Sequence, residues 1–567
     1  MTPMEADIMD ITTLSVKTKF RKVVHRNISR KAYLAIGLGA LSPCVYAELD
    51  ITGSAQGKSI FQEVERQDED TLSLTTFSVI PQVNATYQTR TFSGLWSGTL
   101  THLERDNDDI GQTQDYAEYS YSAQWAPIGR ALVFQATGAL NYRNGDSSSF
   151  LVSDFLTNSN SLAKTRNNTL SSSLLIENNN WVNAQGSASY SDVASESTSA
   201  NDTPLDNDSY QLYGSLTNGE YARYLIWEVT GSYQNTASNQ SSRGDFITRS
   251  AEAFTDFRVL QKWAIRLTAT HEANQISDRT DTNSITREFN SYGAGLTYRQ
   301  AENRYIALTI NRSDSDTSED DDETFVGLDL LWALSSRTEI GGSYGRRFYG
   351  DSASANMSYN SKHFRSSLSY SEDVTNTSRL LSNPENLGVF VCPVGATSIA
   401  SCFQPASLSY SPSADEQFVE LNSQNLDFDD RIILQKRTNF QMGYDFSRVN
   451  LGVSWLYSEN DYLDEDRLQR TLSMTTTLSY KLGSYTNLNT SLSFARIDGQ
   501  SEDNTYDGSS DNLNATLGLD RSFGKHLVTS LDVSYLDKSG DLSFGGGLYG
   551  SDYTDRRITL SVTYTYQ

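Results

Sequence analysis

The last ten residues of the chain, ITLSVTYTYQ, alternate cleanly between apolar and polar side chains. The apolar set is Ile558, Leu560, Val562, Tyr564 and Tyr566. Because successive side chains of a β-strand point to opposite faces, this segment predicts a strand with one apolar face and one face of hydroxyls. A soluble β-sandwich would bury the apolar face, whereas an outer-membrane barrel would turn that face toward lipid.

The same alternation recurs along most of the chain. Residues 117–125 and 132–142 alternate in this way and are joined by the short segment APIGRA, which predicts a hairpin. Short links such as 299–304 are interleaved with long acidic or Ser-rich links such as 144–167. Residues 48–567 therefore predict a single all-β domain, a transmembrane antiparallel β-barrel of about 24 strands (range about 22 to 26), with short periplasmic turns and long extracellular loops.

Aromatic residues and composition favour the barrel over the sandwich. Only 37% of the 567 residues are hydrophobic, and no window approaches the roughly 18 consecutive apolar residues of a membrane helix. Aromatic residues end the apolar rows at both ends of the expected strands, as Trp125 and Tyr535 do. Two such girdles suit two membrane interfaces, whereas a sandwich would bury its aromatic residues midway along its strands. We therefore expect Ile558 to Tyr566 to be the last barrel strand, closing on the first.

The N-terminus has the pattern of a secretory signal peptide. Basic residues precede the apolar run AYLAIGLGAL, and Val45 and Ala47 are small residues at the positions that a signal peptidase reads. The apolar run is too short for a membrane-spanning helix. We predict that residues 1–47 are a signal peptide with an over-long N-terminus, cleaved after Ala47, and that the mature chain lies in the outer membrane of a Gram-negative bacterium.

Charge and cysteine content narrow the partners. The chain has 70 acidic and 45 basic residues, and removal of the basic N-terminal segment makes the balance more negative. This charge opposes binding to nucleic acid, which needs a basic surface. Cys392 and Cys402 stay in the mature chain, and an oxidising compartment favours a disulfide between them over two free thiols. Both lie in the longest expected loop, residues 376–432, which we expect to be extracellular.

No segment carries a sequence signature for catalysis, and we expect this chain not to be an enzyme. Four histidines stay in the mature chain: His102, His271, His363 and His526. None stands in a recognisable catalytic motif, so structural or solvated roles are expected. The acidic runs 104–111 and 313–323 lack complete EF-hand spacing. The sequence thus predicts no cofactor and no defined metal site, with divalent cations held at most loosely at acidic loops.

Two neighbouring segments resemble a known family. The segments GRRFYGDSASANMSY, residues 345–359, and SLSYSEDVT, residues 367–375, resemble the PEP-CTERM-system-associated outer-membrane β-barrel family found with exopolysaccharide biosynthesis loci. The resemblance implies export or surface anchoring of exopolysaccharide, and no catalytic residues. The partners it implies are exopolysaccharide and its periplasmic export machinery, beside the lipid and lipopolysaccharide that surround any such barrel.

Arg347 is the candidate residue of the lumen. It is three residues from Tyr344 on the same expected strand, and side chains an odd number of residues apart point to opposite faces. Tyr344 belongs to the apolar face, so Arg347 is expected on the polar, inward face. It could contact an anionic saccharide, or it could form an ion pair with one of the many acidic residues. Two other functions stay open at this stage: a general porin, and a structural barrel that binds a surface polymer or partner through its acidic loops.

Overall fold

The structure is a computed structural model. It describes residues 48–66, 70–106, 112–145, 155–156, 159, 162–198, 204–239, 245–276, 285–315, 323–382, 390–393, 402, 416–419, 431–463, 467–501, 506–544 and 552–566. The chain separates into two units, Met1–Glu48 and Leu49–Gln567, and the second is the one described below. The predicted signal peptide and its cleavage site after Ala47 lie outside the described residues.

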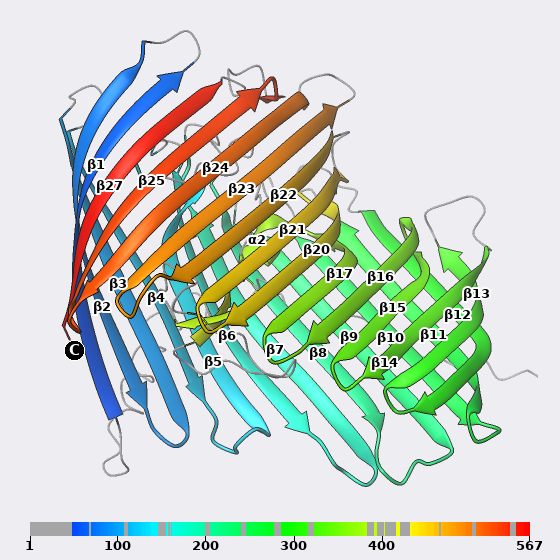
Figure 1. Ribbon diagram of the computed structural model, residues 1–567. Helices are drawn as coiled ribbons and strands as arrows, with labels where there is room; N and C mark the ends of the chain where they lie inside the picture. The colour runs from blue at the N-terminus through cyan, green and yellow to red at the C-terminus, as the bar shows by residue number, and fades with distance from the viewer. Residues whose placement is uncertain are drawn as a thin grey trace, which may run out of the picture. The chain divides into compact units, whose positions relative to one another are not determined.

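Twenty-four strands form a closed antiparallel ring, which confirms the predicted barrel (Figure 1). In ring order they are β1 (Glu48–Arg66), β2 (Leu72–Gln88), β3 (Phe92–Arg105), β4 (Thr113–Trp125), β5 (Leu132–Asn144), β6 (Leu162–Ile176), β7 (Val182–Ser195), β8 (Asp206–Asn218), β9 (Leu225–Ser238), β10 (Phe246–Arg258), β11 (Trp263–Ile276), β12 (Ile285–Ala301), β13 (Arg304–Ser315), β14 (Thr324–Ser335), β15 (Thr338–Arg347), β16 (Gly350–Asn360), β17 (Phe364–Thr375), β20 (Ile433–Phe446), β21 (Val449–Tyr462), β22 (Arg467–Lys481), β23 (Thr486–Ser501), β24 (Tyr506–Phe523), β25 (Leu527–Gly540) and β27 (Tyr553–Tyr566).

Four short elements lie outside this ring order. Strands β18 (Phe390–Pro393) and β19 (Glu416–Val419) pair with each other, and β26 (Ser543–Phe544) pairs with β24. Helix α2 (Thr377–Ser382) follows directly after β17. Among the described residues, no helix is long and apolar enough to cross a membrane.

The ring closes between the first and last strands, as predicted. Strand β27 pairs with β1 in unbroken register from Gly53 opposite Tyr566 to Arg66 opposite Tyr553. On its other side β27 pairs with β25. Each backbone group of the terminal strand can thus be hydrogen-bonded within the sheet, and no strand edge is left for lipid or for another chain.

The outer face of the ring is apolar. On β27 the exposed fractions are 51% for Ile558, 52% for Leu560, 43% for Val562, 51% for Tyr564 and 69% for Tyr566. The residues between them are more buried, with Ser561 only 2% exposed. The terminal strand therefore has the predicted division, with its apolar side turned outward and its hydroxyl side turned to the lumen.

Aromatic side chains gather at both ends of the outer face. Near the short turns, Trp125 stacks on Phe134 with ring centres 5.4 Å apart. Near the opposite rim, the rings of Tyr190 and Tyr210 are 5.1 Å apart. Tyr142 ends the apolar row of β5, and its ring packs against Tyr116 and Phe155.

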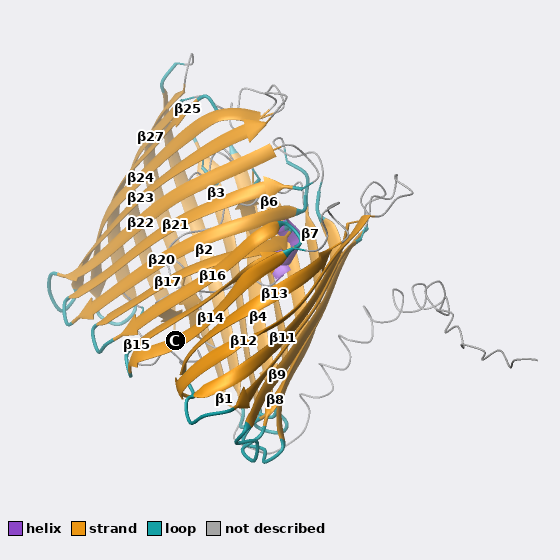
Figure 2. Cartoon of the chain, turned by 90° about the vertical axis from the view of Figure 1, so that its right-hand side faces the viewer, coloured by secondary structure: helices purple, strands orange, loops and turns teal. Residues whose placement is uncertain are grey.

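Long and short connections alternate around the barrel, so its two rims differ. The turns after β6, β12 and β22 are short, and they lie at one end of the barrel, where Figure 2 shows them in teal. Both β1 and β27 have their chain ends at this same rim. We call it the short-turn rim, and the opposite end the long-loop rim. In outer-membrane barrels the short turns face the periplasm.

The wall turns back on itself between β11 and β14 (Figure 1). At this corner Gly295 of β12 lies opposite Thr309 of β13. A Cβ atom on Gly295 would come within 2.6 Å of the Thr309 Cα atom, so only glycine allows the two strands to approach this closely. Beside this corner Arg347 of β15 reaches Glu272 of β11, and we call the interior between β10 and β17, which such contacts cross, the narrow lobe.

The outward face can be tested with one charged substitution. Leu560→Arg places a cation against lipid near the middle of β27, which should destabilise the folded barrel by about 2 to 4 kcal/mol. Thr563→Arg, on the inward face of the same strand, should cost much less. The measurement is the fraction of heat-modifiable, folded barrel at increasing urea concentration. Equal losses for the two variants would contradict the assignment of the faces.

The assignment of the two rims predicts which turns are accessible from outside the cell. In a variant without Cys392 and Cys402, single cysteines replace Ser539 at the long-loop rim or Ser484 in a short turn. An impermeant thiol reagent added to intact cells should label only the Ser539→Cys protein, whereas lysed cells should label both. Preferential labelling of Ser484→Cys on intact cells would mean that the barrel has the opposite orientation.

Candidate functional site

The chain enters the lumen directly after β17. Residues 376–382, which include α2 and which we call the strap, contact β6, β7 and β8, on the other side of the ring from β17 (Figure 2). The strap contacts Asn167 on β6 and Asn207 on β8. Each of these lies an odd number of residues from an outward-facing leucine of its own strand, Leu170 or Leu212, so each faces inward. The strap therefore lies on the inner face of this wall. Residues 376–432 were predicted to form an extracellular loop, and the strap, which is the first part of this segment, lies against the inner wall at the long-loop ends of the strands.

Arg379 holds the strap to β9 and β10. Its Nε donates to the hydroxyl of Thr236 at 3.1 Å, and its Nη1 donates to the hydroxyl of Thr248 at 2.8 Å. Its Nη2 donates to the carbonyl oxygen of Phe246 at 3.1 Å, and the guanidinium carbon lies 3.6 Å from the centre of the Phe246 ring. Hydrogen bonds of a charged group contribute about 1.5 to 3 kcal/mol each, so this residue is a strong anchor.

Further contacts hold the helix itself. The Asn207 amide donates to the Ser378 hydroxyl at 2.6 Å, and the Asn167 amide donates to the Leu381 carbonyl oxygen at 3.1 Å. Both pairs join the strap to the lumen face of β6 and β8. The Leu381 side chain completes a buried apolar cluster with Ala163, Val193 and Leu205. Polar and apolar contacts thus act together to position α2 against this wall.

Arg347 lies in the lumen, as its parity predicts, and is held in an ion pair. Its Nε and Nη2 donate to the two carboxylate oxygens of Glu272 at 2.9 and 2.6 Å. Its Nη1 donates to the Glu372 carbonyl oxygen at 3.3 Å. Of the two roles open to Arg347 from the sequence, the structure shows the ion pair. The pair links β15 to β11 across the narrow lobe.

A second charged network lies nearer the short-turn rim. Asp256 is fully buried and accepts from Arg266 at 2.7 and 3.0 Å, from Thr297 at 2.9 Å and from Arg299 at 3.1 Å. Arg266 also donates to Asp329 at 2.7 Å. Each charge has an opposite partner, as buried ions require. Sequence reasoning missed this network, although each member stands on the inward parity of its strand.

Apolar side chains fill the narrow lobe on the long-loop side of these charges. Six buried residues from β10, β12, β17, β20 and their connections form one cluster: Phe246, Phe289, Phe348, Val374, Ile432 and Leu434. Phe246 belongs both to this cluster and to the binding site of Arg379. The strap and the filled lobe are therefore parts of one packed region inside the barrel.

The predicted disulfide is present between Cys392 and Cys402. Cys392 belongs to β18, whose residues Phe390 and Val391 have no exposed surface. The bridge closes a short ring within the long β17–β20 connection, so it constrains this connection rather than the barrel wall.

The histidines form local contacts. Near the long-loop rim, the Nδ1 atom of His102 lies 2.7 Å from Asp115, and that of His271 lies 2.7 Å from Asn290. His363 and His526 lie near the short-turn rim, each 2.9 Å from a backbone carbonyl oxygen. The described residues contain no group of three or more His, Cys, Asp or Glu that could hold a metal ion.

The expectation that this chain has no catalytic or metal site stays a prediction, because parts of both acidic runs fall outside the described residues. In run 104–111 these are residues 107–111, and in run 313–323 they are residues 316–322. The described part of the second run includes Glu323, which precedes β14 and pairs with Arg346 on the neighbouring strand β15.

Comparisons with known proteins give similarity to solved structures only. No family model matches the chain, and no curated protein matches it. The siderophore receptor PirA from Acinetobacter baumannii is similar over 93% of this chain and 81% of its own, with 9% identity and a TM-score of 0.39. A mutant of the ferric enterobactin receptor PfeA from Pseudomonas aeruginosa is similar over 90% and 80%, with 11% identity and a TM-score of 0.34.

A third solved structure is the outer membrane protein OpdK from Pseudomonas aeruginosa. It is similar over 91% of this chain and 99% of its own, with 8% identity and a TM-score of 0.29. All three TM-scores are below 0.5, so none of these likenesses bears on the site or the function of this chain.

The class of the protein follows from its own geometry. A closed ring with an apolar outer face and two aromatic girdles is the form in which β-structure crosses a bilayer. The chain is an outer-membrane β-barrel of a Gram-negative bacterium. Its interior combines a polar wall, two networks of paired charges and a strap.

The strap predicts a conductance change on removal of its anchor. Arg379→Ala deletes three hydrogen bonds and a cation–π contact, so the strap should leave the wall more often. Single-channel conductance in planar bilayers should rise, with more frequent transitions between levels. The control is Arg337→Ala, which removes one positive charge from an exposed turn at the short-turn rim, away from the strap. It should leave the frequency of conductance transitions unchanged. Identical traces for the two variants would show that the strap does not limit passage.

Proposed function

We propose that this barrel is a gated passage for a polar polymer, and that the polymer is an exopolysaccharide which the barrel exports or anchors at the cell surface. The observation that carries the proposal is the strap, fixed across the lumen of a ring of 24 strands. Rings of this size enclose a space that is either an aqueous channel or a plugged lumen. A strap held by side-chain contacts can close such a space and can also be released.

The inner wall suits a polar cargo. Strands β20 to β22 present inward a buried row of hydroxyl and amide groups that includes Gln441, Ser454 and Ser473. The charged groups described above are paired with one another, as Asp256 is with Arg266. In the structure the hydroxyl and amide side chains of this row have almost no exposed surface, so they become available to a cargo only when the lumen opens, as a gated passage requires. They would then offer hydrogen bonds without a strong field of one sign, which favours a hydrated, hydroxyl-rich chain over a small ion selected by charge.

The identity of the polymer rests on the family resemblance of residues 345–359 and 367–375. These segments form β15 to β17 and the turn that carries Phe348, so they build the narrow lobe and lead into the strap. The strap begins directly after the second of these segments. The partners implied are the exopolysaccharide and a periplasmic export machinery at the short-turn rim.

Two alternative functions are distinguished by their requirements. A general porin would need an open path for small solutes, and a strap joined to the wall by Arg379 disfavours such a path. A surface-binding barrel would act through its acidic loops and would not need the lumen. Neither alternative requires that release of the strap changes passage.

Deletion of the barrel tests the proposal. Polymer at the cell surface should fall at least about tenfold, because passage is lost, while other outer-membrane proteins keep their levels. Native protein expressed from a plasmid in the deletion strain should restore the surface polymer. The Leu560→Arg variant should restore less polymer, in proportion to its smaller amount of folded barrel. Surface polymer is measured by its sugar content after mild washing. Unchanged polymer in the deletion strain would remove the role in export and anchoring.

A further inference from the structure

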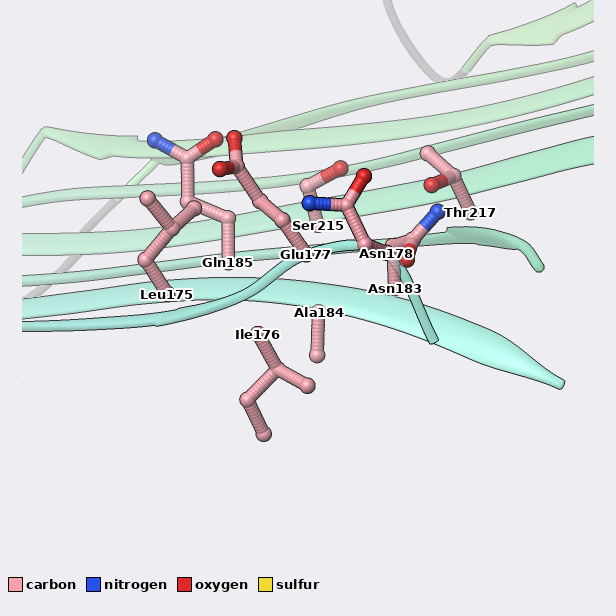
Figure 3. A pocket seen from close by; sticks show the side chains of 9 residues that line it. All are labelled: Leu175, Ile176, Glu177, Asn178, Asn183, Ala184, Gln185, Ser215 and Thr217. Atoms are coloured by element: carbon pink, nitrogen blue, oxygen red, sulfur yellow. The ribbon is translucent and has the colours of Figure 1, made fainter. Parts of the chain in front are cut away.

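A groove opens on the inner wall near the short-turn rim, where β6 and β8 end and β7 begins (Figure 3). Its volume is about 360 Å³, toward the lower end of the roughly 300 to 1,000 Å³ of small-ligand sites. The strap is bound farther along the same wall, at Asn167 and Asn207, toward the long-loop rim. The groove is thus a feature separate from the strap, placed where a polymer from the periplasmic side would first meet the wall.

The polar side chains of the groove point into the lumen. Figure 3 shows Glu177, Gln185 and Ser215 extending to one side of the sheet, while Ile176 and Ala184 extend to the other. Ile176 is 41% exposed on the outward face, which fixes the first side as the lumen side.

The strand register carries the polar row onward around the wall. Gln185 lies opposite Ser215, and Ser215 lies opposite Thr230 of the next strand. Asn183 lies opposite Thr217 in the same way, one step nearer the rim. A linear molecule could therefore follow the wall from this groove across successive strands.

Two kinds of polar group line the groove. Asn183 is already engaged, since its amide donates to the Asn218 carbonyl oxygen at 3.2 Å and its Oδ1 atom accepts from the Asn179 backbone at 3.0 Å. In contrast, within the described part of the chain no hydrogen bond occupies the side chains of Glu177 or Gln185. The groove therefore offers one amide and one carboxylate to a ligand.

We propose that this groove binds a neutral hexose unit of the polymer, an inference that rests on the proposed function and names its substrate class. A side-chain amide both donates and accepts, as Gln185 can toward two adjacent sugar hydroxyls. Leu175, in register with Gln185, supplies apolar surface for the carbon face of the ring. The Glu177 carboxylate accepts a hydrogen bond from a sugar hydroxyl and repels a uronate or sulfate group. The groove thus selects neutral units over acidic ones.

The test uses the full mature barrel in lipid nanodiscs with two kinds of probe: neutral hexasaccharides of glucose, galactose or mannose, and a hexasaccharide of glucuronic acid. Calorimetric titration should show binding of at least one neutral probe and much weaker binding of the acidic one. Gln185→Ala should lower the affinity for the neutral probe about tenfold, which is the loss expected for about one net hydrogen bond. Gln211→Ala, farther along the lumen face of β8, is the matched control and should leave affinity within about twofold.

Glu177→Gln keeps the shape of an exposed side chain and removes its charge, so it should strengthen binding of the acidic probe several-fold. This gain cannot arise from misfolding. Absence of binding by every neutral probe, tighter binding of the acidic probe to the native barrel, or equal effects of Gln185→Ala and Gln211→Ala would each overturn the proposal. If the purified barrel binds the neutral sugar but the deletion strain keeps its surface polymer, the sugar-binding groove stands and only the role in export is wrong.

Discussion

The structure depends on one constraint, which is that a backbone in lipid has no water to satisfy its polar groups. Each unpaired N–H or C=O in the bilayer costs several kcal/mol, so a sheet can span the membrane only as a closed ring. Pairing of β27 with β1 meets this requirement over the whole terminal strand. Once the ring is closed, every strand has one face toward lipid and one toward the lumen, and the alternation of the sequence follows.

The lumen face has the opposite requirement, because its polar groups must be satisfied inside the barrel. Asp256 accepts hydrogen bonds from side chains of two neighbouring strands, β11 and β12, and Arg347 reaches from β15 to Glu272 on β11. Gly295 allows β12 to approach its neighbour β13 closely, two residues from Thr297, which donates to Asp256. The strap uses the same interactions on a larger scale, and is therefore held by the wall rather than by its own short helix.

Strand number, closure and the lipid face could be predicted from the sequence, because each follows from a local alternation such as that of residues 558–566. The pairing of Cys392 with Cys402 could be predicted because they are the only cysteines of the predicted mature chain. Parity placed Arg347 in the lumen, but Glu272 lies 75 residues away and no local pattern selects it. The strap was missed for the same reason, since Arg379 meets Thr248 at a separation of 131 residues.

The central claim, that the strap crosses the lumen and is bound to the opposite wall, can be measured by cross-linking in native outer membranes. In a background without Cys392 and Cys402, Asn207→Cys and Ser378→Cys replace two side chains that are hydrogen-bonded at 2.6 Å. Mild oxidation should join this pair rapidly and nearly completely, seen as a mobility shift that reductant reverses. Ser378→Cys with Gln441→Cys, on the β20 wall, should stay unlinked. Failure of the first pair to form, or equal rates for both pairs, would contradict the account.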